Sequence, residues 1–324
     1  AMSGGFRVRG WGLRLALASP CRLLSAAVVL ALLRHWFAPA GPIYKDLPAR
    51  IRTGWRTPAS RAAWAAFAGT RPAILFVGYL AVVMFGYNNG RPPLRVSENE
   101  IGNLQMRWDS AWYFGIATEG YRMVSQNPSQ QENVVFFPAF PMLMRLGGRL
   151  LGGSSTAFVL AGTVIAFGAF FWGLVYLFRL ARDLLDSEDA ARYSLWLLAT
   201  YPFAWFFSAM YTESLFLLGA TGAFYHFRRR DLVKAGAWGL LVGLTRPNGC
   251  FLSIPLAVIA VAPWLPSWIV GGTHRSSPGD RALRQVVPAL ISAAMPGIGV
   301  LLYSAYIWHV TGNPLMWAAG HAAW

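Results

Sequence analysis

Charged residues are scarce in this chain. They make up 13% of its 324 residues, whereas 56% are hydrophobic. Average soluble domains carry roughly 25% charged residues. The shortage excludes an ordinary soluble globule and predicts an all-α polytopic membrane protein. At roughly 20 apolar residues per membrane span, the length suits a bundle of about six to eight helices.

Metal-binding, phosphate-binding and nucleophile motifs are also missing. The two cysteines, Cys21 and Cys250, lie far apart and predict neither a disulfide framework nor a metal site. There is no His/Cys cluster with metal-ligand spacing, no Gly-rich phosphate loop and no nucleophilic Ser or Cys motif. No cleavable signal peptide is predicted either. We therefore expect no metal and no nucleotide-sugar site, so an enzyme of this kind would need a lipid-linked donor.

Acidic residues are few, and basic ones gather near the start of the chain. The chain has 13 acids against 28 Lys and Arg, a formal net charge of +15, and Asp46 is the only acid before Arg71. Because this excess is mostly local, it favours a cytoplasmic flank and contact with anionic lipid over nucleic-acid binding. We predict a basic cytoplasmic or interfacial segment over 1–71, with an amphipathic stretch over 43–68, and a membrane domain over 72–324.

Apolar runs define the predicted spans. They cover 72–87, 157–178, 190–207, 212–227 and 286–308, and 235–262 is expected to form two short spans. Pro247 and Gly249 would interrupt the helix between those two. Arg228, Arg229 and Arg230 mark the cytoplasmic side. The apolar segment that ends at Trp324 leads us to expect further helices.

A long polar loop over 88–154 separates the first two spans and is expected to carry two interfacial helices. With this topology, unusual polar clusters from distant parts of the sequence fall on the extracytoplasmic side. They are the Asp109 loop, Phe136–Pro141, Tyr211–Ser214, Thr245–Gly249 and Gly312–Leu315. Convergence of this kind is what an active site needs.

Asp109 is the first candidate for chemistry. A carboxylate at a membrane interface is expensive and usually functional, and it could act as a general base on an attacking hydroxyl. Two other interpretations stay open at this point. Asp109 could instead cap the helix that follows it, or form an ion pair with Arg107.

Arg246 and Glu213 form a second candidate pair. A guanidinium inside an apolar stretch must pair or meet water, so Arg246 could pair with Glu213 or Asp109, or clamp a lipid phosphate. Glu213 could orient a substrate. Its alternative role is to favour the dipole of a helix that Thr212 caps.

Other residues complete the predicted binding site. Arg107 could share phosphate binding, and His321 could contact a phosphate or leaving group, although a polar interfacial anchor is the alternative. The remaining candidates are Asn248 in the Thr245–Gly249 break and the aromatics Trp108, Trp112 and Tyr113, which could line a sugar or prenyl groove or form an interface belt.

Four blocks of sequence together resemble a known family. RWDSAWYFGIATEGY (Arg107–Tyr121), FFPAFP (Phe136–Pro141), YPFAWFFSAMYTESLF (Tyr201–Phe216) and LTRPNG (Leu244–Gly249) are similar, in order and spacing, to the PIG-V-type mannosyltransferases. These are GT-C-fold enzymes, and the eukaryotic member adds the second mannose to the glycosylphosphatidylinositol anchor precursor. The similarity covers roughly 72–324.

The resemblance implies a GT-C helix bundle that uses a polyprenyl-phosphate-mannose donor on the extracytoplasmic side. It implies inversion to an α-mannoside, Asp109 as catalytic base and no metal or other cofactor. The Ala-, Arg- and Trp-rich composition suggests a bacterial inner membrane, so the acceptor is open among a glycolipid, a glycan and a protein. Another lipid-linked sugar is an alternative, as is a non-catalytic lipid transporter or assembly scaffold.

Overall fold

The computed structural model describes residues 7–10, 13–16, 56–86, 94–123, 127, 129–262 and 280–323. The chain forms two compact units, Ala1–Arg61 and Ala62–Trp324. In the first, β1 (Arg7–Gly10) and β2 (Leu13–Ala16) pair antiparallel, a hairpin that the sequence did not predict. From residue 56 on, the described chain is helical with connecting loops, which confirms the all-α prediction.

The first long helix, α3 (Pro58–Phe85), begins earlier than predicted. Thr57 starts it, because its hydroxyl accepts a hydrogen bond from the Ser60 backbone N–H at 3.1 Å. Pro72 lies inside the helix without ending it. The expected span at 72–87 and the end of the amphipathic stretch over 43–68 are therefore one helix, and the predicted boundary at 71/72 falls within it. Residues 43–55 lie outside the described part of the chain.

Helix α7 (Ser155–Leu185) agrees with the predicted second span, and the Ser154 hydroxyl caps its start. The prediction of one continuous span over 190–207 is wrong, because two separate helices lie there. Helix α8 (Glu188–Thr200) stops before Pro202, and the short 3₁₀ helix η2 (Ala204–Phe207) follows. Because proline disfavours the α conformation in the preceding residue, Tyr201 is extended, with a ψ of 141°. The chain then re-enters the bundle as α9 (Glu213–Arg228).

The predicted break at Thr245–Gly249 is confirmed. Helix α10 (Leu232–Thr245) ends at an extended Arg246, and η3 (Pro247–Leu252) and α11 (Ser253–Val261) follow it. Helix α13 (Asp280–Thr311) packs closely on α10. A Cβ at Gly243 would lie 1.9 Å from the Pro296 carbonyl oxygen, so only glycine permits this approach. The break thereby lies against a tightly packed helix pair.

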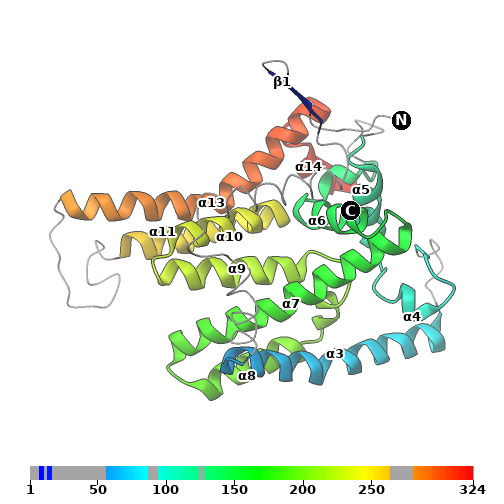
Figure 1. Cartoon of the computed structure of the whole chain (residues 1–324), viewed down its shortest axis with the longest axis horizontal. Helices are drawn as coiled ribbons and strands as arrows, with labels where there is room; N and C mark the ends of the chain where they lie inside the picture. Colours follow the sequence, from blue (N-terminus) through cyan, green and yellow to red (C-terminus); the bar gives the residue numbers. More distant parts are fainter. Residues whose placement is uncertain are drawn as a thin grey trace. The chain divides into compact units, whose positions relative to one another are not determined.

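The long loop folds against one end of these helices. It carries α4 (Glu100–Asn103), α5 (Ser110–Glu119), η1 (Asn133–Val135) and α6 (Ala139–Leu150). The tail forms α14 (Met316–Ala319) and η5 (Gly320–Ala323). Figure 1 shows α5, α6 and α14 grouped at one end, where α9, α10 and α13 run side by side away from them. This grouping assembles the site.

Three of the described helices are long and apolar enough to cross a membrane: Pro58–Phe85, Ser155–Leu185 and Val286–Thr311. Helices α10 and α11 are apolar but shorter. The sequence also predicts a cytoplasmic flank at His274 and Arg275, and these two residues lie outside the described part of the chain. Membrane association therefore rests on these three helices, fewer than the sequence predicted.

Candidate active site

The backbone around Asp109 is held by the segment that precedes α9. The Asp109 N–H donates to the Tyr211 hydroxyl at 2.6 Å, and the Met210 N–H donates to the Gln105 carbonyl at 3.1 Å. Trp108 adopts a φ of 47°, a region that non-glycine residues rarely occupy. Two segments about a hundred residues apart in sequence therefore fix where the Asp109 carboxylate lies.

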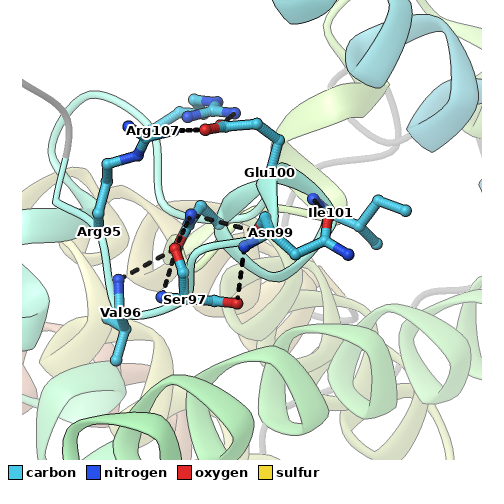
Figure 2. Close-up of polar contacts among 8 residues, drawn as sticks. Arg95, Val96, Ser97, Asn99, Glu100, Ile101 and Arg107 are labelled. Atoms are coloured by element: carbon cyan, nitrogen blue, oxygen red, sulfur yellow. Dashed lines mark hydrogen bonds and ion pairs between the residues drawn. The ribbon is translucent and has the colours of Figure 1, made fainter.

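The Asp109 side chain is used for neither of the structural roles considered above. It stands at the N-cap position of α5, but its backbone is helical (φ −76°, ψ −1°) and its carboxylate makes no capping hydrogen bond. Arg107 lies toward Glu100 instead, with 3.9 Å between the closest nitrogen and oxygen (Figure 2). Thr212 likewise makes no side-chain cap at the start of α9. The capping alternatives are wrong for both helices.

Figure 2 also shows the turn that carries Glu100. The Asn99 side chain caps α4, and the buried Asn103 side chain accepts hydrogen bonds from the Val96 and Ser97 backbone N–H groups. This compact turn presents Glu100, which also pairs with Arg95. Arg107 therefore lies, with Arg95, in the ion pairs around Glu100 at the start of α4.

The Asp109 carboxylate borders a cavity of about 340 Å³, here called the reaction cavity. Its walls come from α5, the Phe136–Phe137 segment, Tyr211, the α10–η3 break and η5. Of the predicted site residues, it is lined by Asp109, Tyr113, Arg246, Asn248 and His321. Four of the five predicted clusters thus meet here. The fifth, Gly312–Leu315, does not line the cavity, and His321 reaches it from the same tail.

Arg246 is ion-paired with one carboxylate and acts at longer range on another. Its Nη1 lies 2.7 Å from the Glu213 Oε1, and its positive charge also acts on Asp109. Burial raises the pKa of the Asp109 carboxyl above its usual range, and the Arg246 charge partly opposes that rise. Such a carboxylate is a better proton acceptor than an exposed one.

The buried tyrosines of the cavity stay neutral. Burial raises the pKa of both Tyr113 and Tyr211 above the usual value of a phenol. Tyr211 can therefore keep its hydroxyl as a hydrogen-bonding group on the Asp109 backbone. Tyr211 was absent from the predicted site residues, because only the folded chain shows that it reaches Asp109.

The other predicted residues lie around the reaction cavity without lining it. Glu213 does not line the cavity itself but forms an ion pair with Arg246, which does. Trp108 is 66% exposed and packs on Phe206, with 5.3 Å between the ring centroids. Trp112 stacks on Phe136, which does line the cavity. The substrate-binding roles predicted for these residues and for Arg107 stay predictions.

Arg71 was assigned to the basic cytoplasmic or interfacial segment over 1–71, but it lies within α3. It is 2% exposed in the middle of α3, where it donates to the carbonyls of Ala199 (2.6 Å) and Ala204 (2.7 Å) and to the Ser208 hydroxyl (3.1 Å). Those carbonyls belong to the end of α8 and to η2, where helical hydrogen bonding stops. Non-helical backbone at membrane depth needs such protein partners.

Replacing Arg71 by Met should lower the free energy of unfolding by about 3 kcal/mol, because it leaves buried carbonyls without donors. The measurement is thermal unfolding of the purified protein in lipid nanodiscs. Arg61→Met is the matched control, since Arg61 is exposed on the same helix. Equal unfolding temperatures for the two variants would contradict the role given to Arg71.

Residues 94–264 match the family model described as mannosyltransferase (PIG-V). The match covers more than half of the chain and includes Asp109, Glu213 and Arg246. The chain belongs to the PIG-V mannosyltransferase family. It is therefore a glycosyltransferase, as predicted. No curated protein and no solved structure matches the chain significantly.

Within the described residues, no group of three or more His, Cys, Asp or Glu side chains could hold a metal ion. The expectation of a metal-independent enzyme stays a prediction. In the reaction cavity, the charged groups available for chemistry are those of Asp109 and Arg246, with Glu213 behind the latter.

Proposed function

We propose that this PIG-V family member transfers mannose from a polyprenyl-phosphate-mannose donor to a hydroxyl acceptor, with inversion at the anomeric carbon. One observation carries the proposal: Asp109 and Arg246 line the same cavity. The Asp109 carboxylate caps no helix, and the Arg246 guanidinium has the geometry to bind a phosphate. Family membership supports mannose as the sugar. The lack of a nucleotide-binding loop in the sequence favours the lipid-linked donor.

The groups fit a single displacement. The Asp109 carboxylate takes the proton of the acceptor hydroxyl while that oxygen attacks the anomeric carbon. The bond from this carbon to the phosphate oxygen breaks, and prenyl phosphate leaves with one more negative charge. Arg246 lies where it can stabilise that charge, and Glu213 orients Arg246. A β-linked donor would give an α-mannoside.

The ends of α9 support an extracytoplasmic reaction cavity. Glu213 lies at the start of this helix, beside Arg246, and Arg228, Arg229 and Arg230 lie at or beyond its end. Sixteen residues at 1.5 Å each separate the two ends by about 24 Å. Because arginines favour the cytoplasmic side, the cavity would face outward in a multi-pass, inner-membrane protein.

The test is turnover by the purified protein in nanodiscs, with a glycolipid, a glycan and a Ser/Thr-rich peptide each supplied as acceptor, and with polyprenyl-phosphate-mannose, polyprenyl-phosphate-glucose and GDP-mannose as donors in parallel. We expect prenyl phosphate release with the lipid-linked mannose, and none with GDP-mannose. Use of GDP-mannose would contradict the lipid donor, and preference for the glucose lipid would contradict the sugar. No turnover of any donor would favour a transporter or scaffold role.

A further inference from the structure

Helix α6 carries a row of exposed leucines, here called the leucine row. Leu143, Leu146 and Leu150 recur at helical spacing on one face, and Leu146 and Leu150 are each 49% exposed. A helix with such a face and with arginines beside it is typical of a helix that lies in the surface of a bilayer, with the apolar side chains toward the acyl chains.

A different face of α6 is fixed on a helix long and apolar enough to cross a membrane, α7. A Cβ at Gly148 would lie 2.2 Å from the Phe158 ring, and a Cβ at Gly147 would lie 2.9 Å from the Ala161 Cβ. Glycines of this kind let two helices approach closely. The direction in which the leucine row points is therefore set by the packing of α6 on α7.

Helix α13 indicates the level of α6 in the bilayer. The Arg145 guanidinium lies close enough to the Tyr306 side chain for the two groups to interact electrostatically. Tyr306 and Trp308 are exposed near the end of α13, in a segment that is long and apolar enough to span a membrane. Exposed aromatic residues at the end of a span favour the boundary between acyl chains and headgroups. Arg145 therefore lies at the level of the headgroups.

Two arginines beside the leucine row, Arg145 and Arg149, have no carboxylate partner within the described chain. They are four residues apart, so their side chains lie on one side of α6. The Arg145 Nη1 lies beside Gly120, 3.3 Å from where a Cβ would stand. Burial and the nearby charge of Arg149 both lower the pKa of Arg145. An anion bound by both guanidiniums would offset this repulsion.

The donor phosphate assigned to Arg246 does not account for these two arginines. Arg246 lines the reaction cavity, and neither Arg145 nor Arg149 does. A free phosphate would contact the arginines but not the leucines next to them. A phospholipid satisfies both, because its phosphate accepts hydrogen bonds from guanidinium groups and its acyl chains pack on leucine side chains.

We infer that α6 docks on the bilayer surface at the reaction-cavity end of the molecule and binds the phosphate of an anionic phospholipid with Arg145 and Arg149. The leucine row lies among the acyl chains, and the lipid is a component of the bilayer and not a substrate. A net anionic headgroup is favoured over a zwitterionic one, because no carboxylate of the described chain pairs with the arginines or stands ready for an ammonium group.

The test is phosphatidylglycerol binding by the purified protein, released from phosphatidylcholine nanodiscs with graded phosphatidylglycerol and measured by native mass spectrometry. We expect Arg145→Gln/Arg149→Gln to bind it more weakly, by about fivefold for each arginine removed. Arg149→Lys should keep most of the affinity, because it keeps the charge. Arg182→Gln is the matched control, since Arg182 is an exposed arginine in the last turn of α7 with a carboxylate partner, Asp183, at 3.6 Å.

Equal affinity for phosphatidylglycerol in wild type and the double variant would overturn the inference. An equal loss in Arg182→Gln would also overturn it, because the effect would then be that of any surface arginine. Leu146→Gln should weaken binding too. If it does not, and glycerol phosphate competes with the lipid, the site takes free phosphate and not a bilayer lipid. Displacement by polyprenyl phosphate would assign the site to a substrate and contradict the inference. The measurement needs no turnover, so its result does not depend on the proposed function.

Discussion

Replacing Asp109 by Asn should lower kcat for mannosyl transfer about a hundredfold or more, the scale of a lost general base. The amide keeps the size of the side chain and leaves the backbone hydrogen bond from Asp109 to Tyr211 in place. The fold should therefore persist while proton abstraction is lost. The measurement is prenyl phosphate release from polyprenyl-phosphate-mannose, together with thermal unfolding of both proteins.

The pH profile of the wild type gives a second readout of the same group. The base must be deprotonated to work, and burial raises the pKa of Asp109 above its ordinary value of about 4. Activity should therefore fall as the pH drops through that raised value, and the acidic limb should lie above about pH 4. Asp189→Asn, at an exposed position on α8, is the control and should leave the profile unchanged. Wild-type activity in Asp109→Asn would exclude Asp109 as the base.

Replacing Arg246 by Met should lower kcat/KM for the lipid donor about a hundredfold, because the leaving phosphate loses its positive partner. Arg246→Lys should retain part of the activity, since it keeps the charge but not the planar fork. The acidic side of the pH–activity profile, measured on the activity that remains in these variants, gives a further check. Because Arg246 lowers the pKa of Asp109, its loss should move that limb to higher pH.

A double variant separates catalysis from structure at this pair. One Glu213 oxygen is bonded to Arg246, and the other is buried with no hydrogen-bond partner within the described chain. Arg246→Met alone therefore leaves a destabilised carboxylate, which Glu213→Gln should relieve. We expect the double variant to regain thermal stability and to stay inactive. Recovered activity would show that Arg246 serves only to neutralise Glu213.

The site could be predicted in part because its residues carry local signals. Asp109 stands out as an acid among aromatics, and Arg246 stands out inside an apolar run next to Pro247. Arg71 carries no such signal, and Tyr211 carries one only as part of the predicted Tyr211–Ser214 cluster. Tyr211 resembles the other aromatics around it, and Arg71 resembles the basic residues that precede it. Their roles depend on partners about a hundred residues away or more.

Predicted helix boundaries failed where tertiary contacts outweigh composition. The predicted span begins only after Arg71, yet the Arg71 guanidinium donates hydrogen bonds to the end of α8, so α3 runs through this residue. The run over 190–207 looked apolar enough to be one helix, but Pro202 ends α8, and the freed carbonyls of this region accept hydrogen bonds from Arg71.

Composition and motif order by themselves determined that this chain is a helical membrane protein of the PIG-V mannosyltransferase family, because both are properties of the linear chain. Only the tertiary structure decided how the carboxylates are used. In the folded chain the Asp109 carboxylate makes no capping hydrogen bond, and Glu213 forms an ion pair with Arg246. The physical reason is that capping, ion pairing and cavity walls depend on distances between segments, and the folding of α5, α9, α10 and the tail sets those distances.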